Sequence, residues 1–246
     1  MLASYSERML RFIFIPVTVL VFGLKIFLQA EEKGFTNLFN GRDLAGWTQK
    51  GGKATYAVKN GTIIGTAVNG TPNSFLCTEK LYGDFVLEYE YRCDARLNSG
   101  VQIRSNVFAK DTVVKLGNGK TRKIAAHRVH GYQVEIDPNK PSRMWSGGIY
   151  DEGRRGWLYP GMLGGDAATF TKAGQKAYKA SAWNRVRVEC RGESIKTWLN
   201  GVARADFKDR LTAKGFIGLQ VHGIGGNKAL AGAQVQWRNL RIKPLR

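Results

Sequence analysis

Residues 183–207 have the sequence WNRVRVECRGESIKTWLNGVARADF, and this stretch decides the fold class. Apolar and polar side chains alternate along its three short runs, which is the period of a half-buried β-strand. The pair Asn200-Gly201 separates the last two runs and is a strong hairpin signal, because both residues tolerate the positive φ of a tight turn. Arg191-Gly192-Glu193 separates the first two runs. The stretch therefore predicts two consecutive β-hairpins.

The same alternation recurs on both sides of this stretch, between turns rich in Gly, Asn and Asp. No segment after Glu31 has the long 3.6-residue apolar period of a helix. Many short strands of this kind predict an all-β antiparallel sandwich or jelly roll. Residues 105–130 and 151–182 lack the alternating pattern of strands. We expect long loops there, the second with one helical turn. The strands are expected at Thr62–Thr66, Phe85–Arg92, Val101–Arg104, Tyr132–Asp137, Trp183–Cys190, Ile195–Leu199, Phe216–His222 and Val235–Ile242.

The composition is that of a folded globular protein. The chain has 246 residues, of which 43% are hydrophobic and 23% charged, and this excludes a disordered chain. The formal net charge of +19 would suit an anionic partner. However, the Lys and Arg residues are spread along the chain, and no zinc-finger spacing, RNP-type motif or basic helix occurs. We therefore expect a solvated basic surface and no nucleic-acid partner.

Residues 1–30 have the pattern of a targeting segment. A basic start is followed by the apolar run 12–24 and by the small residue Ala30. This order predicts a secretory signal peptide, and the alternative is an uncleaved N-terminal anchor. Either places the body, residues 31–246, outside the cytoplasm, in the periplasm or extracellular space. Contact with a membrane is expected only through an uncleaved segment.

Three cysteines, Cys77, Cys93 and Cys190, occur in the body. Their number is odd and their spacings match no metal motif. Since Cys93 and Cys190 lie inside apolar strand-like runs, we predict buried free thiols.

Three predicted strands carry an apolar face and an opposite face of functional polar groups. Alternate residues of a strand share a face, so each set of polar residues should lie together. Such a face is either an ordinary solvent-exposed face or the lining of a ligand site. The polar faces carry Gln102 and Arg104, then Gln133, Glu135 and Asp137, and finally Gln220 and His222.

Glu135 and Asp137 are the most informative pair. Strand geometry separates their Cα atoms by roughly 6–7 Å, which suits the two carboxyls of a glycosidase. The alternative is a structural network of ion pairs with Arg104 or Arg154. His222 is either structural or an acid/base group.

No metal motif accompanies these residues, and metal ligands stay unassigned. The other two histidines, His127 and His130, have neither H-x-H nor H-E-x-x-H spacing.

The segment 147–157 combines acids, arginines and aromatic residues. Aromatic rings stack on sugars, and Arg and carboxylate groups bind hydroxyls, so Tyr150 and Glu152 are candidate carbohydrate ligands. The alternative is a charged loop whose Trp157 packs into the core.

Four longer motifs point to one family. They are Gly34–Trp47 (GFTNLFNGRDLAGW), Asn98–Arg104 (NSGVQIR), Gly131–Asp137 (GYQVEID) and Gly218–Gly223 (GLQVHG). With them, essentially all of residues 34–246 resembles the 3-keto-disaccharide hydrolase, or 3-keto-glucoside 1,2-lyase/3-keto-2-hydroxy-glucal hydratase, domain family. The resemblance implies a concanavalin-like jelly-roll sandwich. It also implies an exported enzyme whose partner is an oxidised (3-keto) glucoside or disaccharide.

The implied chemistry is elimination. A ketone at C3 acidifies the C2 proton, a base removes it, and the enolate expels the aglycone from C1, after which water can add. We expect His222 or Glu135 to be the base, and Arg104 or a bound divalent metal to stabilise the enolate. Asp137, Tyr150 or Glu152 would act as the acid or position the sugar. The expected substrate-binding residues are Gln102, Gln133, Gln220, Glu152, Arg154 and Trp157.

Two other functions fit the same residues. A conventional glycoside hydrolase would use Glu135 and Asp137 on unoxidised sugars, and a carbohydrate-binding module would bind sugar without turnover. Sandwich folds host both, so the fold cannot separate them.

Overall fold

The computed structural model describes residues 33–117 and 119–245. The predicted signal peptide or anchor lies outside these residues, and the export inferred from it stays a prediction. Among the described residues, no helix is both long and apolar enough to cross a bilayer.

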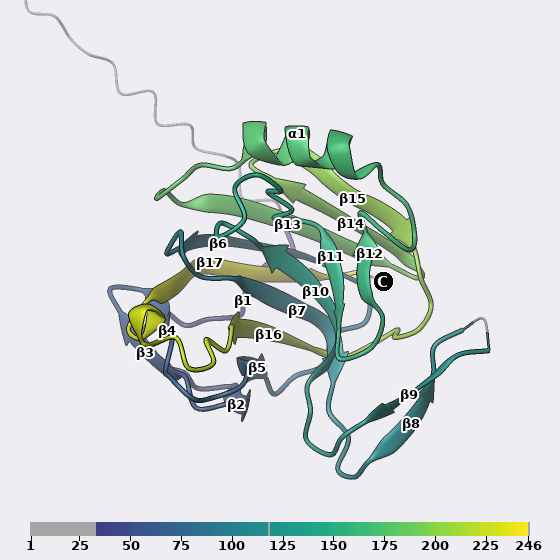
Figure 1. Cartoon of the computed structure of the whole chain (residues 1–246), viewed down its shortest axis with the longest axis horizontal. Coiled ribbons are helices and arrows are strands. Elements are labelled where there is room, and N and C mark those ends of the chain that lie inside the picture. The colour runs from purple at the N-terminus through teal and green to yellow at the C-terminus, as the bar shows by residue number, and fades with distance from the viewer. Residues whose placement is uncertain (1–32, 118, 246) are drawn as a thin grey trace, which may run out of the picture. The chain divides into compact units, whose positions relative to one another are not determined.

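Two antiparallel sheets form the body, and the all-β sandwich prediction is confirmed (Figure 1). The first sheet has the order β15 (Val202–Lys208), β14 (Ser194–Leu199), β13 (Asn184–Arg191), β6 (Phe85–Cys93), β17 (Gln234–Pro244), β4 (Thr62–Thr66) and β3 (Thr55–Lys59), with β1 (Thr36–Asn37) paired to β17. The second has the order β12 (Gly156–Tyr159), β11 (Ile149–Glu152), β10 (His130–Ile136), β7 (Ser99–Asn106), β16 (Phe216–Val221), β5 (Ser74–Thr78) and β2 (Trp47–Gly51).

The two hairpins predicted from residues 183–207 are β13–β14 and β14–β15. Asn200 and Gly201 have φ of 50° and 85°, as a tight type I′ turn requires. Asn60 and Gly61 repeat this geometry between β3 and β4. Local turn chemistry therefore sets these connections.

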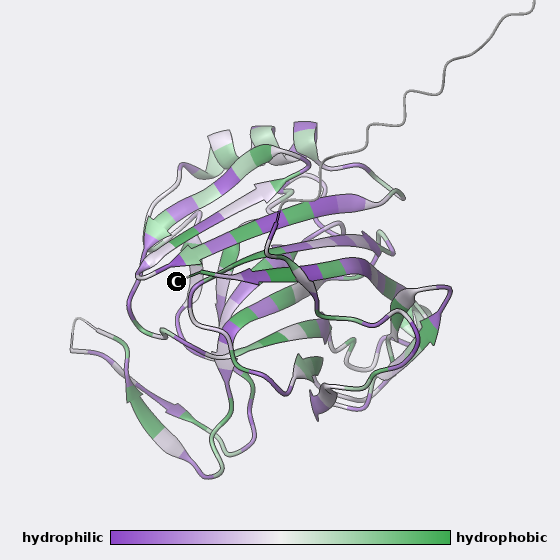
Figure 2. Ribbon diagram, turned by 180° about the vertical axis from the view of Figure 1, so that it is seen from behind, coloured by the Kyte–Doolittle hydropathy of each residue, from purple (hydrophilic) through white to green (hydrophobic). Residues whose placement is uncertain are grey.

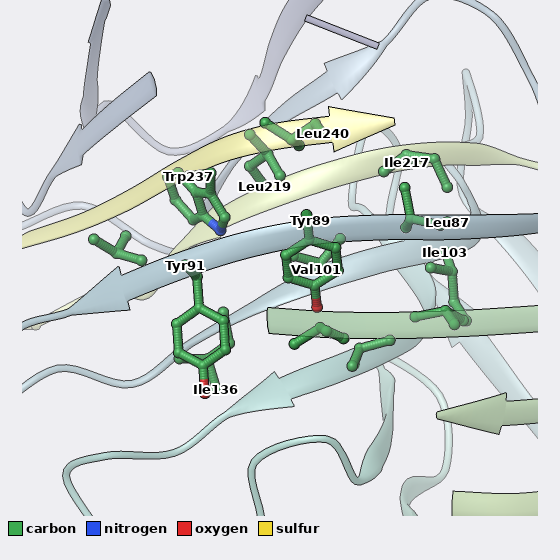
Figure 3. Close-up of a cluster of buried hydrophobic side chains, with 14 of the residues drawn as sticks. Leu87, Tyr89, Tyr91, Val101, Ile103, Ile136, Ile217, Leu219, Trp237 and Leu240 are labelled. Atoms are coloured by element: carbon green, nitrogen blue, oxygen red, sulfur yellow. The ribbon is translucent and has the colours of Figure 1, made fainter. Parts of the chain in front are cut away.

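The core lies between the sheets. Tyr89, Tyr91 and Trp237 of the first sheet belong to one buried cluster with Val101 and Ile136 of the second (Figure 3). The alternation that buries these residues is visible as alternating colours along the strands in Figure 2. Cys77, Cys93 and Cys190 are buried free thiols, as predicted.

Both stretches expected to be loops contain regular structure. Residues 105–130 include the hairpin of β8 (Thr112–Lys115) and β9 (Thr121–Ile124), which projects from the sandwich (Figure 1). Residues 151–182 include the strand β12 and the three-turn helix α1 (Ala167–Ala177), not a single helical turn. A short 3₁₀ helix, η1 (Lys228–Leu230), precedes β17.

Helix α1 was missed because tertiary contacts define it. Asp166 caps it by accepting the N–H of Thr169, and only Phe170, Gly174 and Ala177 of the helix are buried. The buried guanidinium of Arg204 on β15 donates to the carbonyls of Phe170, Met144 and Ser146. Arg204 thus fixes α1 and the loop between β10 and β11, which carries part of the site described below.

On the outer face of the first sheet, Glu88 accepts hydrogen bonds from three arginines on the neighbouring strands, at 2.7–2.9 Å: Arg185, Arg187 and Arg241. Burial alone would raise the pKa of Glu88, but these hydrogen bonds outweigh it and lower the pKa. The ionised carboxylate therefore stabilises the sheet.

We predict that Glu88→Gln lowers the free energy of unfolding at neutral pH by about 1–3 kcal/mol. The folded-state pKa of Glu88 lies below the ordinary glutamate value of about 4.5, so the stabilisation by its carboxylate is complete above that value and is lost as the pH falls through the folded pKa. Urea unfolding of both proteins should converge under acidic conditions. Glu189→Gln, whose partner Arg191 lies 4.0 Å away at the surface, is the control and should change little. An effect of Glu88→Gln that does not depend on pH would contradict the assignment.

Candidate functional site

The outer face of the second sheet gathers the polar residues of three neighbouring strands. Gly100 of β7 pairs with Glu135 of β10 on one side and with Gln220 of β16 on the other. A Cβ on Gly100 would lie 2.5 Å from Cγ and Cδ of Gln133, so only glycine leaves room for that side chain. Because the alternate residues face the core, these polar groups lie together, as the pattern predicted.

A chain of side-chain amides connects them. Gln133 Oε1 accepts from Gln102 Nε2 at 2.6 Å and from Gln220 Nε2 at 2.8 Å. Ser105 donates to Gln102 Oε1, which fixes the direction of the chain. The amide nitrogen Nε2 of Gln133 donates to Glu135 Oε2 at 2.9 Å. The amides therefore orient the carboxyl of Glu135.

Glu135 is 4% exposed and also accepts from Asn98 Nδ2 at 2.5 Å. Burial raises the pKa of Glu135 to about 8, and the hydrogen bonds from Asn98 and Gln133 only partly oppose this effect. At neutral pH the carboxyl is therefore mostly protonated and can donate a hydrogen bond.

Asp137 directly follows β10 and pairs with Arg143 of the same loop. Nε and Nη2 of Arg143 both lie 2.8 Å from Asp137 Oδ2. The guanidinium also lies over the rings of Trp145 and Trp157, 4.8 and 4.9 Å from their centroids. Burial raises the pKa of Asp137 despite the ion pair. Asp137 and the two indoles thus hold a cation at the site.

These groups surround a cavity of about 390 Å³, which we call the polar pocket. This volume is at the small end for ligand sites and suits one sugar ring. The pocket is lined by Asn73, Asn98, Gln133, Glu135, Asp137, Asn139, Lys140, Arg143, Tyr150, Glu152, Trp157, Gln220 and His222.

His222 follows β16 and is exposed in this pocket. Its Nδ1 lies 2.8 Å from the carbonyl oxygen of Gly223. A carbonyl only accepts, so Nδ1 carries the proton, and in the neutral imidazole Nε2 then has the lone pair. The ring can therefore accept a proton from a ligand.

Two further titratable groups come from β11. The ring of Tyr150 packs edge-on against Trp157, with centroids 5.4 Å apart. Glu152 lies 3.9 Å from Arg128, and burial raises its pKa more than this arginine lowers it.

A family model described as the 3-keto-alpha-glucoside-1,2-lyase-like domain matches residues 34–243. The chain belongs to this family. The resemblance noted in the sequence is thereby confirmed. None of the curated proteins compared with the chain matches it.

Solved structures similar to this 3-keto-alpha-glucoside-1,2-lyase-like domain share its fold. One, described as a putative glycosyl hydrolase from Parabacteroides distasonis, is 19% identical with a TM-score of 0.53, over 86% of this chain and 99% of that one. A protein of unknown function with a galectin-like fold from Bacillus subtilis is 8% identical with a TM-score of 0.54, over 85% of this chain and 94% of that one. At these identities the matches show the fold alone, and they confirm the concanavalin-like sandwich.

Arg104 does not lie in the polar pocket of this lyase-like domain, contrary to the sequence prediction. The register of β7 shifts against both neighbouring strands near this residue, which has a φ of 46°. This β-bulge redirects the side chain. Its guanidinium donates to the carbonyls of Gly83 and Gly192 and to Asp84, and it is 1% exposed. Arg104 joins turns of the fold and does not contact the site.

Arg154 is also misassigned. It pairs with the buried Asp151 at 2.6 Å, donates to Thr212, and lies over the ring of Tyr132. It therefore belongs to a structural ion pair. The alternative prediction, in which Arg104 or Arg154 forms ion pairs with Glu135 and Asp137, is wrong because both arginines have other partners. Gln102, predicted to bind substrate, does not line the pocket. Its amide donates to Gln133 and so helps to orient the amide chain.

Four polar residues of the pocket were not singled out from the sequence as site residues: Asn73, Asn139, Lys140 and Arg143. They lie on loops with no periodic signal. Asn98 was visible only as the start of the NSGVQIR motif. Among residues 33–117 and 119–245, no group of three or more His, Cys, Asp and Glu side chains is arranged to hold a metal ion.

The pKa of Glu135 can be measured directly. We predict that its carboxyl ¹³C resonance titrates near pH 8, and Glu135→Gln assigns the signal. Asn98→Ala removes a hydrogen bond that lowers this pKa, so the midpoint should rise. Asn106→Ala, whose amide binds Lys214 instead, is the matched control and should leave it unchanged. A midpoint near the ordinary glutamate value of about 4.5 would contradict the described burial.

Proposed function

We propose that the polar pocket cleaves 3-keto-glycosides by removing the C2 proton and eliminating the group on C1, with hydration completing a net hydrolysis. One observation carries the proposal. The pocket places an imidazole with a free nitrogen beside three carboxyls with raised pKa values and one guanidinium. Membership of the lyase-like family supports the same chemistry.

His222 is the proposed base. Its Nε2 lone pair takes the C2 proton, and the ring becomes a cation whose Nδ1–H remains bonded to the carbonyl of Gly223. The electron pair of the C2–H bond moves toward C3, and the ketone oxygen becomes an enolate oxygen.

Protonated Glu135 and Arg143 are proposed to stabilise this oxygen. A neutral carboxyl kept protonated by burial donates a hydrogen bond without first losing a charge, and a fixed guanidinium adds positive potential. Arg143 replaces Arg104 in the role inferred from the sequence, because Arg104 lies outside the pocket.

Glu152 is the proposed acid. As the enolate collapses, the C1–O bond breaks, its electron pair goes to the leaving oxygen, and Glu152 supplies the proton. The product is a C1=C2 enone bearing the 2-hydroxyl group, to which water adds at C1. Gln133, Gln220 and Trp157 line the pocket. The two amides are proposed to hold sugar hydroxyls, and the indole of Trp157 is proposed to contact the sugar ring.

We expect purified protein in D₂O to release the aglycone from a 3-keto-glucoside, with deuterium entering at C2, and not from its unoxidised parent. His222→Ala and Glu135→Ala should each lower kcat by about 10²–10⁴-fold. Glu189→Gln, on the outer face of the first sheet, is the control. NMR of both sugars measures release and exchange together.

The other outcomes have distinct meanings. Release from the parent sugar without C2 exchange would support the conventional glycosidase. Sugar binding with no release from either substrate would support a binding module. Full activity in both variants would exclude this site.

The pH profile tests the role of Glu135. If its protonated form is needed, kcat/KM falls as the pH rises through about 8. This alkaline decline should be absent in Glu135→Gln, which retains an N–H donor but does not titrate. A kcat/KM that rises through pH 8 would instead make Glu135 the base.

A further inference from the structure

A second cavity of about 830 Å³ adjoins the polar pocket. We call it the apolar cleft. Its floor and sides include Pro72, Phe75 and Val129, and Ala126 and Arg128 come from the segment that follows the β8–β9 hairpin.

The floor of the cleft belongs to a hydrophobic cluster separate from the sandwich core. Phe75, Cys77, Val129 and Phe216 form this cluster. It lies on the outer side of β5 and β16, because alternate residues such as Leu76 and Leu219 face the core. The outer face of the sheet is thus polar over β10 and β11 and apolar over β5.

The two cavities share a wall. Asn73 and Glu152 line both of them. A ligand with its sugar ring in the polar pocket would therefore pass between these two side chains to reach the apolar cleft. Glu152, the proposed acid, stands where the bond to the leaving group would lie.

We propose that the apolar cleft binds the leaving group of the glycoside and prefers an aromatic aglycone to a second sugar. This inference rests on the proposed function. Thr71, His127 and Arg128 also line the cleft, but over Phe75, Val129 and Pro72 the hydroxyls of a second sugar would lose water without gaining partners. A flat aromatic ring instead buries apolar surface there.

The charge at the rim favours the same occupant. The Arg128 side chain is 51% exposed and lines the cleft beside its apolar floor. A guanidinium is attracted to the face of an aromatic ring. The cleft is also about twice the volume of the polar pocket, which leaves room for a two-ring aglycone.

Ala126→Trp is the variant that tests the cleft. Ala126 is half-buried in the cleft wall, and its N–H, which donates to Asp111, is retained after substitution. Ala125→Trp places the same indole on an exposed neighbour outside the cleft and is the matched control. The substrates are methyl, 2-naphthyl and glucosyl 3-keto-glucosides of one anomeric configuration.

In the unmodified protein, kcat/KM for the naphthyl substrate should exceed that for the glucosyl substrate by at least about tenfold. Ala126→Trp should reduce the ratio of naphthyl to methyl kcat/KM at least about tenfold, and Ala125→Trp should leave this ratio unchanged. Equal loss on both substrates, or a preference for the glucosyl substrate, would overturn the aglycone assignment.

Failure of the proposed function would look different. In that case the methyl substrate shows neither release nor C2 deuteration. Binding of the unoxidised 2-naphthyl glucoside, measured by NMR line broadening, then tests the apolar cleft independently of catalysis. Binding that is lost in Ala126→Trp and kept in Ala125→Trp supports an aromatic site, and binding insensitive to both overturns it.

Discussion

The structure depends on the packing of two inner sheet faces, in which Tyr89 and Trp237 of one sheet share a core with Val101 and Ile136 of the other. A strand has a side-chain period of two, so burying one face fixes the residues on the other. Once Leu219 and Val221 enter the core, Gln220 must face outward. The site is therefore a direct consequence of how the core is filled.

The outer face so produced has two chemical halves. Over β10, the amide of Gln133 connects its neighbours to Glu135, and burial among these groups favours the neutral carboxyl. Over β5, the alternate positions are apolar and form the floor of a second cavity. One sheet thus presents proton-transfer groups and an apolar surface side by side, with Glu152 at the boundary.

Loops from the rest of the chain complete this face. Arg143 reaches Asp137 because Arg204, buried under α1, fixes the loop between β10 and β11. The segment after the β8–β9 hairpin supplies one side of the apolar cleft. These placements depend on contacts between residues far apart in the sequence, which no local pattern records.

The sequence by itself determined the all-β class, the Asn-Gly hairpins, the family, and the shared face of Gln133, Glu135 and Gln220. The family follows from the longer sequence motifs, and the other three features follow from local turn chemistry and a two-residue period. Only the tertiary structure decided the position of Arg104, because a single-residue bulge changes the direction of a side chain without altering the hydrophobic pattern. It also decided the pairing of Asp137 with Arg143 and the raised pKa of Glu135, because both depend on which distant groups exclude water from the pocket.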